Sequence, residues 1–169
     1  LGPLEVRPAE TGSAGQNVRQ RIYRSDGTYF DRVAGTFTWH PQHNHTHFDN
    51  YFRYTLQPVG APGGSQREGH KTTFCLLDTD HVQPGLPGAP NNAGYNTCND
   101  DVQGISVGWG DTYEHWLADQ DIDVTGLPSG DYELTMEVDP LNRLVEVTDD
   151  DNVASIFVRL DFGSNTVTV

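Results

Sequence analysis

The chain has 169 residues, which is long enough for one domain with a substantial hydrophobic core. Aspartate and glutamate number 24 against 10 lysines and arginines, so the formal net charge is −14. This charge argues against a nucleic-acid partner, because binding to phosphates needs a basic face. No apolar run approaches the length of about 18 residues that a membrane span requires, so we expect no membrane span.

The basic residues are unusual, because Lys71 is the only lysine beside nine arginines. The acidic residues are spread along the chain rather than gathered in blocks, as they would be in a disordered tail. Scattered acid with almost no lysine is typical of a surface adapted to high salt, and an ordinary acidic secreted protein is the alternative. Such a surface attracts cationic substrates. Lys71 is present either by chance or because its amine does something that arginine cannot.

The residue pattern predicts strands almost throughout, since apolar and polar residues alternate and β-branched and aromatic residues are frequent. The predicted strands are 17–24, 29–39, 51–59, 71–78, 132–138, 144–147 and 154–160. Residues 81–101 form a long loop without periodicity, and such loops are usually functional or pinned. Residues 112–117 allow a short helical turn, although nearby glycines argue against a long helix.

Short strands separated by turns rich in glycine, proline, asparagine and aspartate predict an all-β fold. We expect a single-domain β-sandwich over residues 1–169, with an Ig-like C-terminal half, long irregular loops and little helix. The first residues, LGPLEVRP, suggest a mature or trimmed form of a secreted or extracellular protein, without a signal peptide.

The chain contains two cysteines, Cys75 and Cys98, which flank the long loop. They are too few for a zinc ribbon, so we expect a disulfide that pins this loop and implies an oxidising compartment. In the chain-entropy model, closing a loop of this length stabilises the fold by about 3 kcal/mol.

Four of the seven histidines lie close together, at His40, His43, His45 and His47. The last three alternate, so in a strand they point to one face. Three same-face residues span about 13 Å at the strand rise, so the strand must bend for all three to reach one ion. Neutral imidazoles suit zinc, copper, iron or nickel, and three imidazoles with open positions suit catalytic zinc or copper. A solvated polar face is the alternative.

Three motifs in this order, HNHTH, EGHKTTFC and WGDTYEHW, resemble the catalytic domain of the lysyl oxidase family. The similarity continues through DIDVTGLPSGDYELTMEVDP and covers roughly residues 37–160. The long cysteine-containing C-terminal part of the animal members is absent here, so their extracellular-matrix specificity is not expected. The acidic composition suggests a microbial, halophilic type.

The resemblance implies one copper ion on His43, His45 and His47, and it matches His40 to a further family histidine, whose role we leave open. It further implies a lysine tyrosylquinone made from Lys71 and Tyr113, and it matches Cys75 to a disulfide position with Cys98 as partner. The activity implied is oxidative deamination of primary amines (peptidyl lysine or small amines) by O2, releasing aldehyde, ammonia and H2O2. Arginine stays protonated and cannot attack a quinone carbon, which explains why one lysine would be retained.

The catalytic base is left open between four residues near the crosslink in the sequence, namely Asp111, Glu114, His70 and His115. Two other functions also remain open. The same histidines would serve a zinc or iron enzyme on a β scaffold. The C-terminal half resembles Ig-like modules of non-enzymatic cell-surface proteins, which would bind no metal.

Overall fold

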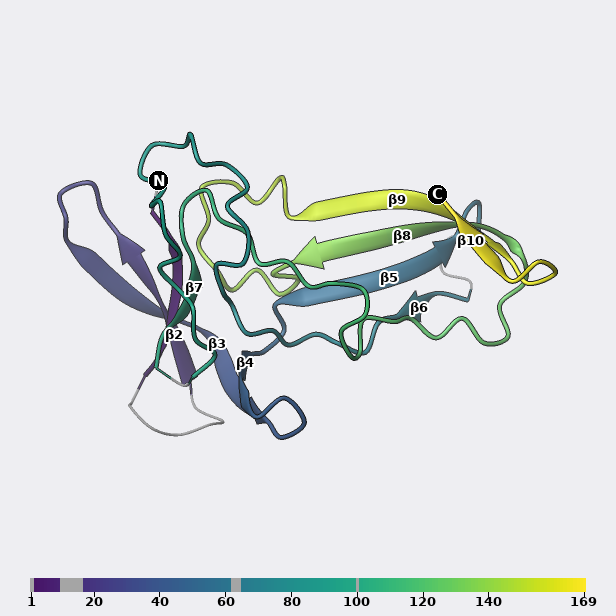
Figure 1. Ribbon diagram of the computed structural model, residues 1–169, viewed down its shortest axis with the longest axis horizontal. Coiled ribbons are helices and arrows are strands. Elements are labelled where there is room, and N and C mark those ends of the chain that lie inside the picture. Colours follow the sequence, from purple (N-terminus) through teal and green to yellow (C-terminus); the bar gives the residue numbers. More distant parts are fainter. Residues whose placement is uncertain (1, 10–16, 62–64, 100) are drawn as a thin grey trace. The chain divides into compact units, whose positions relative to one another are not determined.

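A computed structural model describes residues 2–9, 17–61, 65–99 and 101–169 of the chain (Figure 1). Within these residues the regular structure consists of ten strands, and no residue is helical. The all-β fold class is therefore confirmed, together with the expectation of little helix. Among the described residues there is accordingly no helix that could cross a membrane.

The strands and their bounds, in chain order, are β1 (Leu4–Pro8), β2 (Asn17–Tyr23), β3 (Tyr29–His40), β4 (His45–Phe48), β5 (Phe52–Pro58), β6 (Arg67–Glu68), β7 (Gln103–Ile105), β8 (Gly130–Val138), β9 (Val153–Asp161) and β10 (Thr166–Thr168). All the strand pairs are antiparallel, and they form two five-stranded sheets. The order is β4-β3-β2-β1-β7 in the first sheet and β10-β9-β8-β5-β6 in the second.

The chain divides into two compact units, each built around one of these sheets. The first unit comprises residues 1–50, 73–113 and 141–147, and the second comprises residues 51–72, 114–140 and 148–169. The units are interleaved in the sequence, because the chain passes repeatedly from one to the other. The single domain over residues 1–169 and the sandwich stacking of the two sheets stay predictions.

The core of the first unit lies against β3 and β4, where Phe37 and Phe48 meet edge to face with ring centroids 6.3 Å apart. Both rings are buried. Gly35 allows this packing, because a Cβ atom at that position would lie 2.8 Å from the Phe48 ring. Val6 of β1 and Val18 of β2 complete this buried layer and are fully shielded from solvent.

The second unit has a regular sheet with its own apolar cluster. β5, β8 and β9 pair without a register shift, from Phe52 opposite Val138 to Pro58 opposite Tyr132 on one side of β8. The buried members of the cluster are Leu56, Leu127, Tyr132, Val158 and Leu160. Apolar and polar residues alternate along these strands in the sequence, and this alternation predicted them.

Five predicted strands are confirmed, with ends that shift by one or two residues: they correspond to β2, β3, β5, β8 and β9. The loop predicted over residues 81–101 is irregular in its described part, and Asp100 lies outside the described residues. The predicted helical turn near residues 112–117 is a single hydrogen-bonded turn from Glu114 to Leu117, N···O 2.9 Å.

The strand predicted over residues 71–78 is wrong. This segment makes only an isolated bridge, in which the backbones of Phe74 and Phe48 exchange two hydrogen bonds. Three consecutive residues, Phe74, Cys75 and Leu76, are buried, whereas a half-buried strand buries every second residue. At Leu76 a side chain takes over half of the role of a neighbouring strand, since the N–H donates to Gln103 Oε1 at 3.2 Å while the carbonyl accepts the Gly104 N–H at 3.1 Å.

The strand predicted over residues 144–147 is also wrong, for a related reason. Val145 donates its N–H to Gln20 Oε1 at 2.8 Å and accepts from Gln20 Nε2 at 2.9 Å. One side-chain amide therefore satisfies both backbone groups that a strand partner would otherwise bind. The Gln20 side chain is buried in β2, so this anchoring depends on contacts that lie far apart in the sequence.

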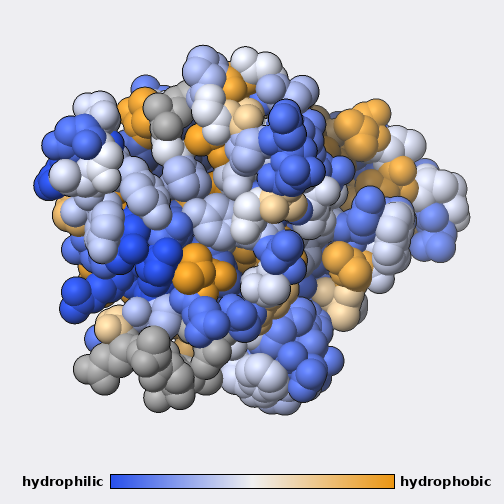
Figure 2. All heavy atoms as spheres, turned by 60° about the vertical axis from the view of Figure 1, so that its left-hand side comes forward, coloured by the Kyte–Doolittle hydropathy of each residue, from blue (hydrophilic) through white to orange (hydrophobic). Residues whose placement is uncertain are grey.

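The surface of the molecule agrees with the hydrophilic composition. Figure 2 shows one face, on which hydrophobic side chains lie in small separate groups among hydrophilic ones. Scattered apolar side chains of this kind are normal for a folded protein surface.

Candidate metal centre

The histidines are brought together by the hairpin that joins β3 to β4. β3 ends at His40, and the backbone N–H groups of His43 and Asn44 both donate to the His40 carbonyl, at 3.1 and 2.9 Å. Asn44 has a φ of 55°, in the left-handed region that asparagine tolerates better than most residues. β4 then begins at His45, directly opposite His40.

This hairpin corrects the sequence interpretation, which placed His43, His45 and His47 along one bent strand. His43 lies in the turn, and only His45 and His47 belong to β4. The turn reverses the chain, so the His43 side chain lies beside those of His45 and His47, with ring centroids 5.4 and 5.1 Å away. The convergence that a bend was expected to produce is produced by a turn instead.

The ring nitrogens of these three histidines lie at the spacing of ligands around a single ion. His47 Nε2 is 2.9 Å from His45 Nε2 and 3.3 Å from His43 Nδ1. With metal–nitrogen distances of about 2.0–2.1 Å, neighbouring ligands are about 2.9 Å apart at a right angle and about 3.3 Å apart at the tetrahedral angle. His47 therefore has the spacing of a ligand that shares one ion with His45 and with His43, and imidazole nitrogens suit copper or zinc.

His40 belongs to the same cluster, because its ring stacks on those of His43 and His47 with centroids 4.1 and 4.7 Å apart. One nitrogen each from His40, His43 and His47 lies within 4.8 Å of the others. His40 Nδ1 is buried and has no hydrogen-bond partner among the residues that the structure describes. The cluster thus offers four imidazoles. The three nitrogens that lie mutually close come from His40, His43 and His47, whereas the predicted ligands are His43, His45 and His47.

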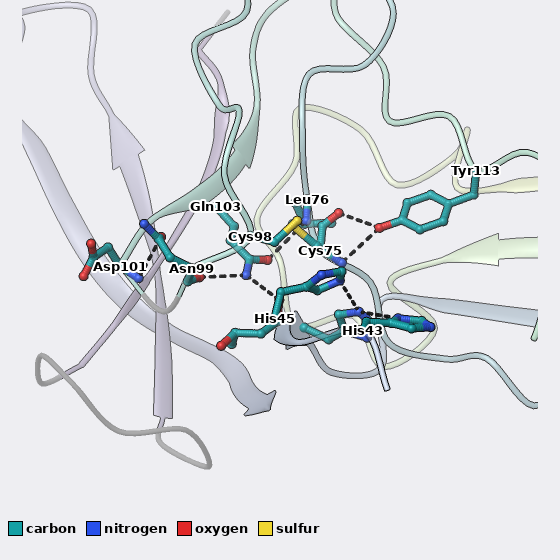
Figure 3. The surroundings of a disulfide bond; sticks show 11 residues. His43, His45, Cys75, Leu76, Cys98, Asn99, Asp101, Gln103 and Tyr113 are labelled. Atoms are coloured by element: carbon teal, nitrogen blue, oxygen red, sulfur yellow. Dashed lines mark hydrogen bonds between the residues drawn. A yellow bond between two sulfur atoms is a disulfide. The ribbon is translucent and has the colours of Figure 1, made fainter. Parts of the chain in front are cut away.

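The disulfide between Cys75 and Cys98 is formed, with its Cα atoms 5.5 Å apart, as the sequence predicted (Figure 3). The long loop also contacts β4 at this point, because the Cys98 carbonyl accepts the N–H of Thr46 at 3.0 Å. Thr46 stands between His45 and His47 in β4. The disulfide therefore fastens the loop directly beside the histidines.

Tyr113 contacts the backbone of the disulfide-bonded Cys75. Its hydroxyl donates to the Cys75 carbonyl at 2.8 Å and accepts from the Cys75 N–H at 3.1 Å, as Figure 3 shows. Its ring meets Phe74 edge to face, with centroids 4.7 Å apart. Tyr113, the disulfide and all four clustered histidines belong to the first unit.

Lys71 belongs to the second unit and is 7% exposed. Lysine is rarely buried to this extent, so this burial agrees with a special role for the amine. Among the four candidate bases, Asp111 shares the first unit with Tyr113, whereas His70, Glu114 and His115 belong to the second. Glu114, His115 and His70 are exposed, and Asp111 is half-buried.

Two residues that support the site were missed by the sequence analysis. Gln103 of β7 is fully buried, and its side-chain amide donates to the Thr46 carbonyl of β4 at 2.8 Å. This hydrogen bond holds β4 in place. Thr73 lies 2.9 Å from His47 through its hydroxyl oxygen. Neither residue belongs to a periodic pattern. The position of Thr73 two residues after Lys71 was the only available signal.

Fold and site together define an all-β protein with a cluster of histidines that could hold a metal ion, in the same unit as a tyrosine whose hydroxyl contacts the backbone of a disulfide-bonded cysteine. A model of the lysyl oxidase family matches residues 20–169. Lysyl oxidase homolog 2A of Danio rerio is 36% identical over 126 residues, which cover 74% of this chain and 16% of that protein. Lysyl oxidase homolog 4 of Mus musculus is 34% identical over 132 residues, covering 75% and 16%. The chain belongs to the lysyl oxidase family, and it spans about a sixth of the curated relatives named here.

Proposed function

We propose that this chain is a copper-dependent amine oxidase that uses a lysine tyrosylquinone made from its own residues. The overall reaction converts a primary amine, O2 and water into an aldehyde, ammonia and H2O2. The observation that carries the proposal is the spacing of 2.9 and 3.3 Å between the ring nitrogens of His47 and those of His45 and His43. Membership of the lysyl oxidase family supports the same activity.

His43, His45 and His47 would hold the copper ion through neutral imidazole nitrogens. Copper would supply the redox chemistry that lets O2 oxidise the Tyr113 ring to a quinone. The amine of Lys71 contributes the nucleophile, and it must lose a proton before its nitrogen bonds to a ring carbon. Arginine could not replace it, because the guanidinium remains protonated.

Tyr113 is oriented for this chemistry by the backbone of Cys75, which contacts its hydroxyl through both the N–H and the C=O group. Two hydrogen bonds to one peptide residue fix where the phenol oxygen lies. A base must then remove the α-proton of the substrate amine. We propose Asp111 first among the four candidates, because it lies two residues before Tyr113 in the same unit.

The substrate proposed is a cationic primary amine, either peptidyl lysine or a small amine. The net charge of −14 favours the approach of cations, and high salt weakens that attraction. The disulfide supports secretion into an oxidising compartment. The excess of acid with a single lysine supports a microbial, halophilic origin, for which the melting temperature should rise with KCl concentration.

The test uses two substitutions that spare the histidines, Lys71→Arg and Tyr113→Phe. Wild-type protein incubated with copper and air should develop visible absorbance, produce H2O2 with primary amines and yield a crosslinked peptide containing both residues. Both variants should bind copper as the wild type does. Neither should form the absorbing species or oxidise amines, because one lacks the nucleophilic amine and the other the phenol oxygen.

Two results would reject the proposal. The first is amine oxidation at the full rate by a copper-loaded, aerated sample in which Lys71 still reacts with amine reagents. The second is a wild-type protein that binds no copper under any loading condition. A colourless, zinc-dependent activity would indicate the metalloenzyme on a β scaffold instead.

A further inference from the structure

The most buried histidine of the cluster is held by a side chain from a different segment of the chain. His47 is 1% exposed, and its Nδ1 atom lies 2.9 Å from the hydroxyl oxygen of Thr73. Its other nitrogen, Nε2, lies at the convergence of the cluster, facing His45 and His43. The two nitrogens of this ring therefore have separate partners on opposite sides.

The Thr73 hydroxyl is positioned by the backbone around it. The next residue, Phe74, exchanges two backbone hydrogen bonds with Phe48, N···O 2.7 and 3.1 Å. Phe48 directly follows His47 in β4, so threonine and histidine are held on paired backbone segments. Cys75 is further tied down by its disulfide to Cys98. The hydroxyl thus faces His47 from an anchored segment outside the hairpin.

This contact determines which nitrogen of His47 is free to bind an ion. A neutral imidazole carries one N–H and one lone pair, on different nitrogens. If Nδ1 donates its hydrogen to Thr73 Oγ1, the lone pair is on Nε2 and faces the other imidazoles. In the opposite tautomer an N–H would lie at 2.9 and 3.3 Å from neighbouring ring nitrogens and would block the site.

We propose that Thr73 is a positioning residue of the metal centre, which holds His47 in the tautomer protonated on Nδ1 and aims Nε2 at the ion. This role rests on the proposed copper site. Partners of this kind orient a ligand ring and raise its basicity, and their loss typically lowers metal affinity about 10–100-fold. The segment KTTFC would then contribute both the lysine of the proposed quinone and the residue that orients a copper ligand.

The test compares Thr73→Val, which keeps the shape and removes the hydroxyl, with Thr73→Ser, which keeps the hydroxyl. Thr72→Val is the matched control, because Thr72 contacts Tyr51 through its backbone carbonyl, which accepts the Tyr51 N–H at 2.9 Å. Copper(II) affinity is measured by competition with a chelator of known affinity. We expect about a 10–100-fold loss for Thr73→Val and less than about a threefold change for Thr73→Ser and Thr72→Val.

The electron paramagnetic resonance spectrum of bound copper(II) supplies a second signature. Thr73→Val should change the g-values and copper hyperfine splitting, and Thr73→Ser should restore the wild-type spectrum. Thr73→Ala, which also lacks the hydroxyl, should behave as Thr73→Val and replaces it if the valine variant does not fold. Circular dichroism of the metal-free variants confirms that each retains its strands.

The outcomes separate this inference from the proposed function. Copper binding by the wild type, with an unchanged affinity and spectrum in Thr73→Val, overturns the role of Thr73 and leaves the proposed function intact. A loss of affinity in the serine variant as large as that in the valine variant also overturns it, because the hydroxyl would then be irrelevant. A wild-type protein that binds no copper overturns both.

Discussion

The contacts inside the first unit differ in kind from the contacts inside the second unit. In the second unit, backbone hydrogen bonds join β5, β8 and β9 in unbroken register, and an apolar cluster fills one face. In the first unit, β4 pairs with β3 on one side only, and residues 73–78 and 141–147 have no regular strand pairing. Buried polar side chains hold these segments in place: Gln103 binds β4 and Leu76, and Gln20 binds Val145.

Asp78 is the clearest example of a buried polar side chain that binds several backbone groups. It is 8% exposed and accepts four hydrogen bonds, from the N–H groups of Gly94, Tyr95 and Ser106 and from the Ser106 hydroxyl. One carboxylate thus fastens the long loop to the strand that follows it. The comparison teaches that in the first unit single buried side chains each satisfy several backbone groups, so single substitutions there should cost more stability than in the regular sheet.

The largest effect is expected at the histidines. Replacing His43, His45 and His47 together by alanine should reduce bound copper from about one ion per chain to almost none, as measured by metal analysis after dialysis. His81→Ala removes a histidine outside the cluster, which stacks on Trp109, and should retain the ion. An unchanged copper content in the triple variant would place the ion elsewhere.

Single substitutions sharpen this result by separating the two geometric sets of ligands. The proposed set contains His45, so His45→Ala should weaken copper binding more than His40→Ala. The reverse order would mean that the ion is bound by His40, His43 and His47.

The next largest effect tests how the loop is held. Asp78→Ala leaves several buried donors without an acceptor, and each such donor costs about 1–3 kcal/mol, so we expect a loss of roughly 3 kcal/mol or more in the free energy of unfolding. Arg159→Ala in the second unit removes an exposed ion pair with Asp131 and should cost less than about 1 kcal/mol. Chemical denaturation of both variants measures the difference. Equal losses in the free energy of unfolding would contradict the proposed difference between the two units.

The disulfide should contribute a comparable amount. Replacing Cys75 and Cys98 by serine opens a loop with a sequence separation of 23, which should lower the free energy of unfolding by about 3 kcal/mol. The wild type, denatured without reductant, should contain no free thiol by titration. Two free thiols per chain would show that the bond does not form in the protein.

The smallest effect concerns the pH dependence of stability, through Glu5 of β1. Burial raises the pKa of the Glu5 carboxyl, but hydrogen bonds from Arg7, Tyr95 and Tyr23 outweigh burial and leave this pKa below its ordinary value. A depressed pKa in the folded state contributes stability above the unfolded value of about 4.3 and loses it as the pH falls through the folded value.

Glu5→Gln should therefore reduce stability at neutral pH and flatten the loss of stability below about pH 4.3. Thermal melts of the wild type and the variant between neutral and acidic pH make the comparison. If stability fell equally steeply with decreasing pH in both proteins, other carboxyl groups would be responsible for the loss.

The amino-acid sequence by itself determined the all-β class, five of the strands and the cysteine pair. It also singled out the residues to which the chemistry is assigned, including His43, His45, His47 and Tyr113. These features are local, because alternation along one strand and a short motif are both readable within a few residues. The ligand roles and the crosslink remain proposals.

The tertiary structure decided what depends on partners distant in the sequence. It placed His43 in a turn, left residues 71–78 and 144–147 without regular pairing, and brought Thr73 to His47. Backbone N–H and C=O groups must be satisfied wherever they are buried, and either a strand or a remote side chain can do this. Periodicity in the sequence does not distinguish the two, so only the folded chain shows that Gln20 and Gln103 take the place of strands.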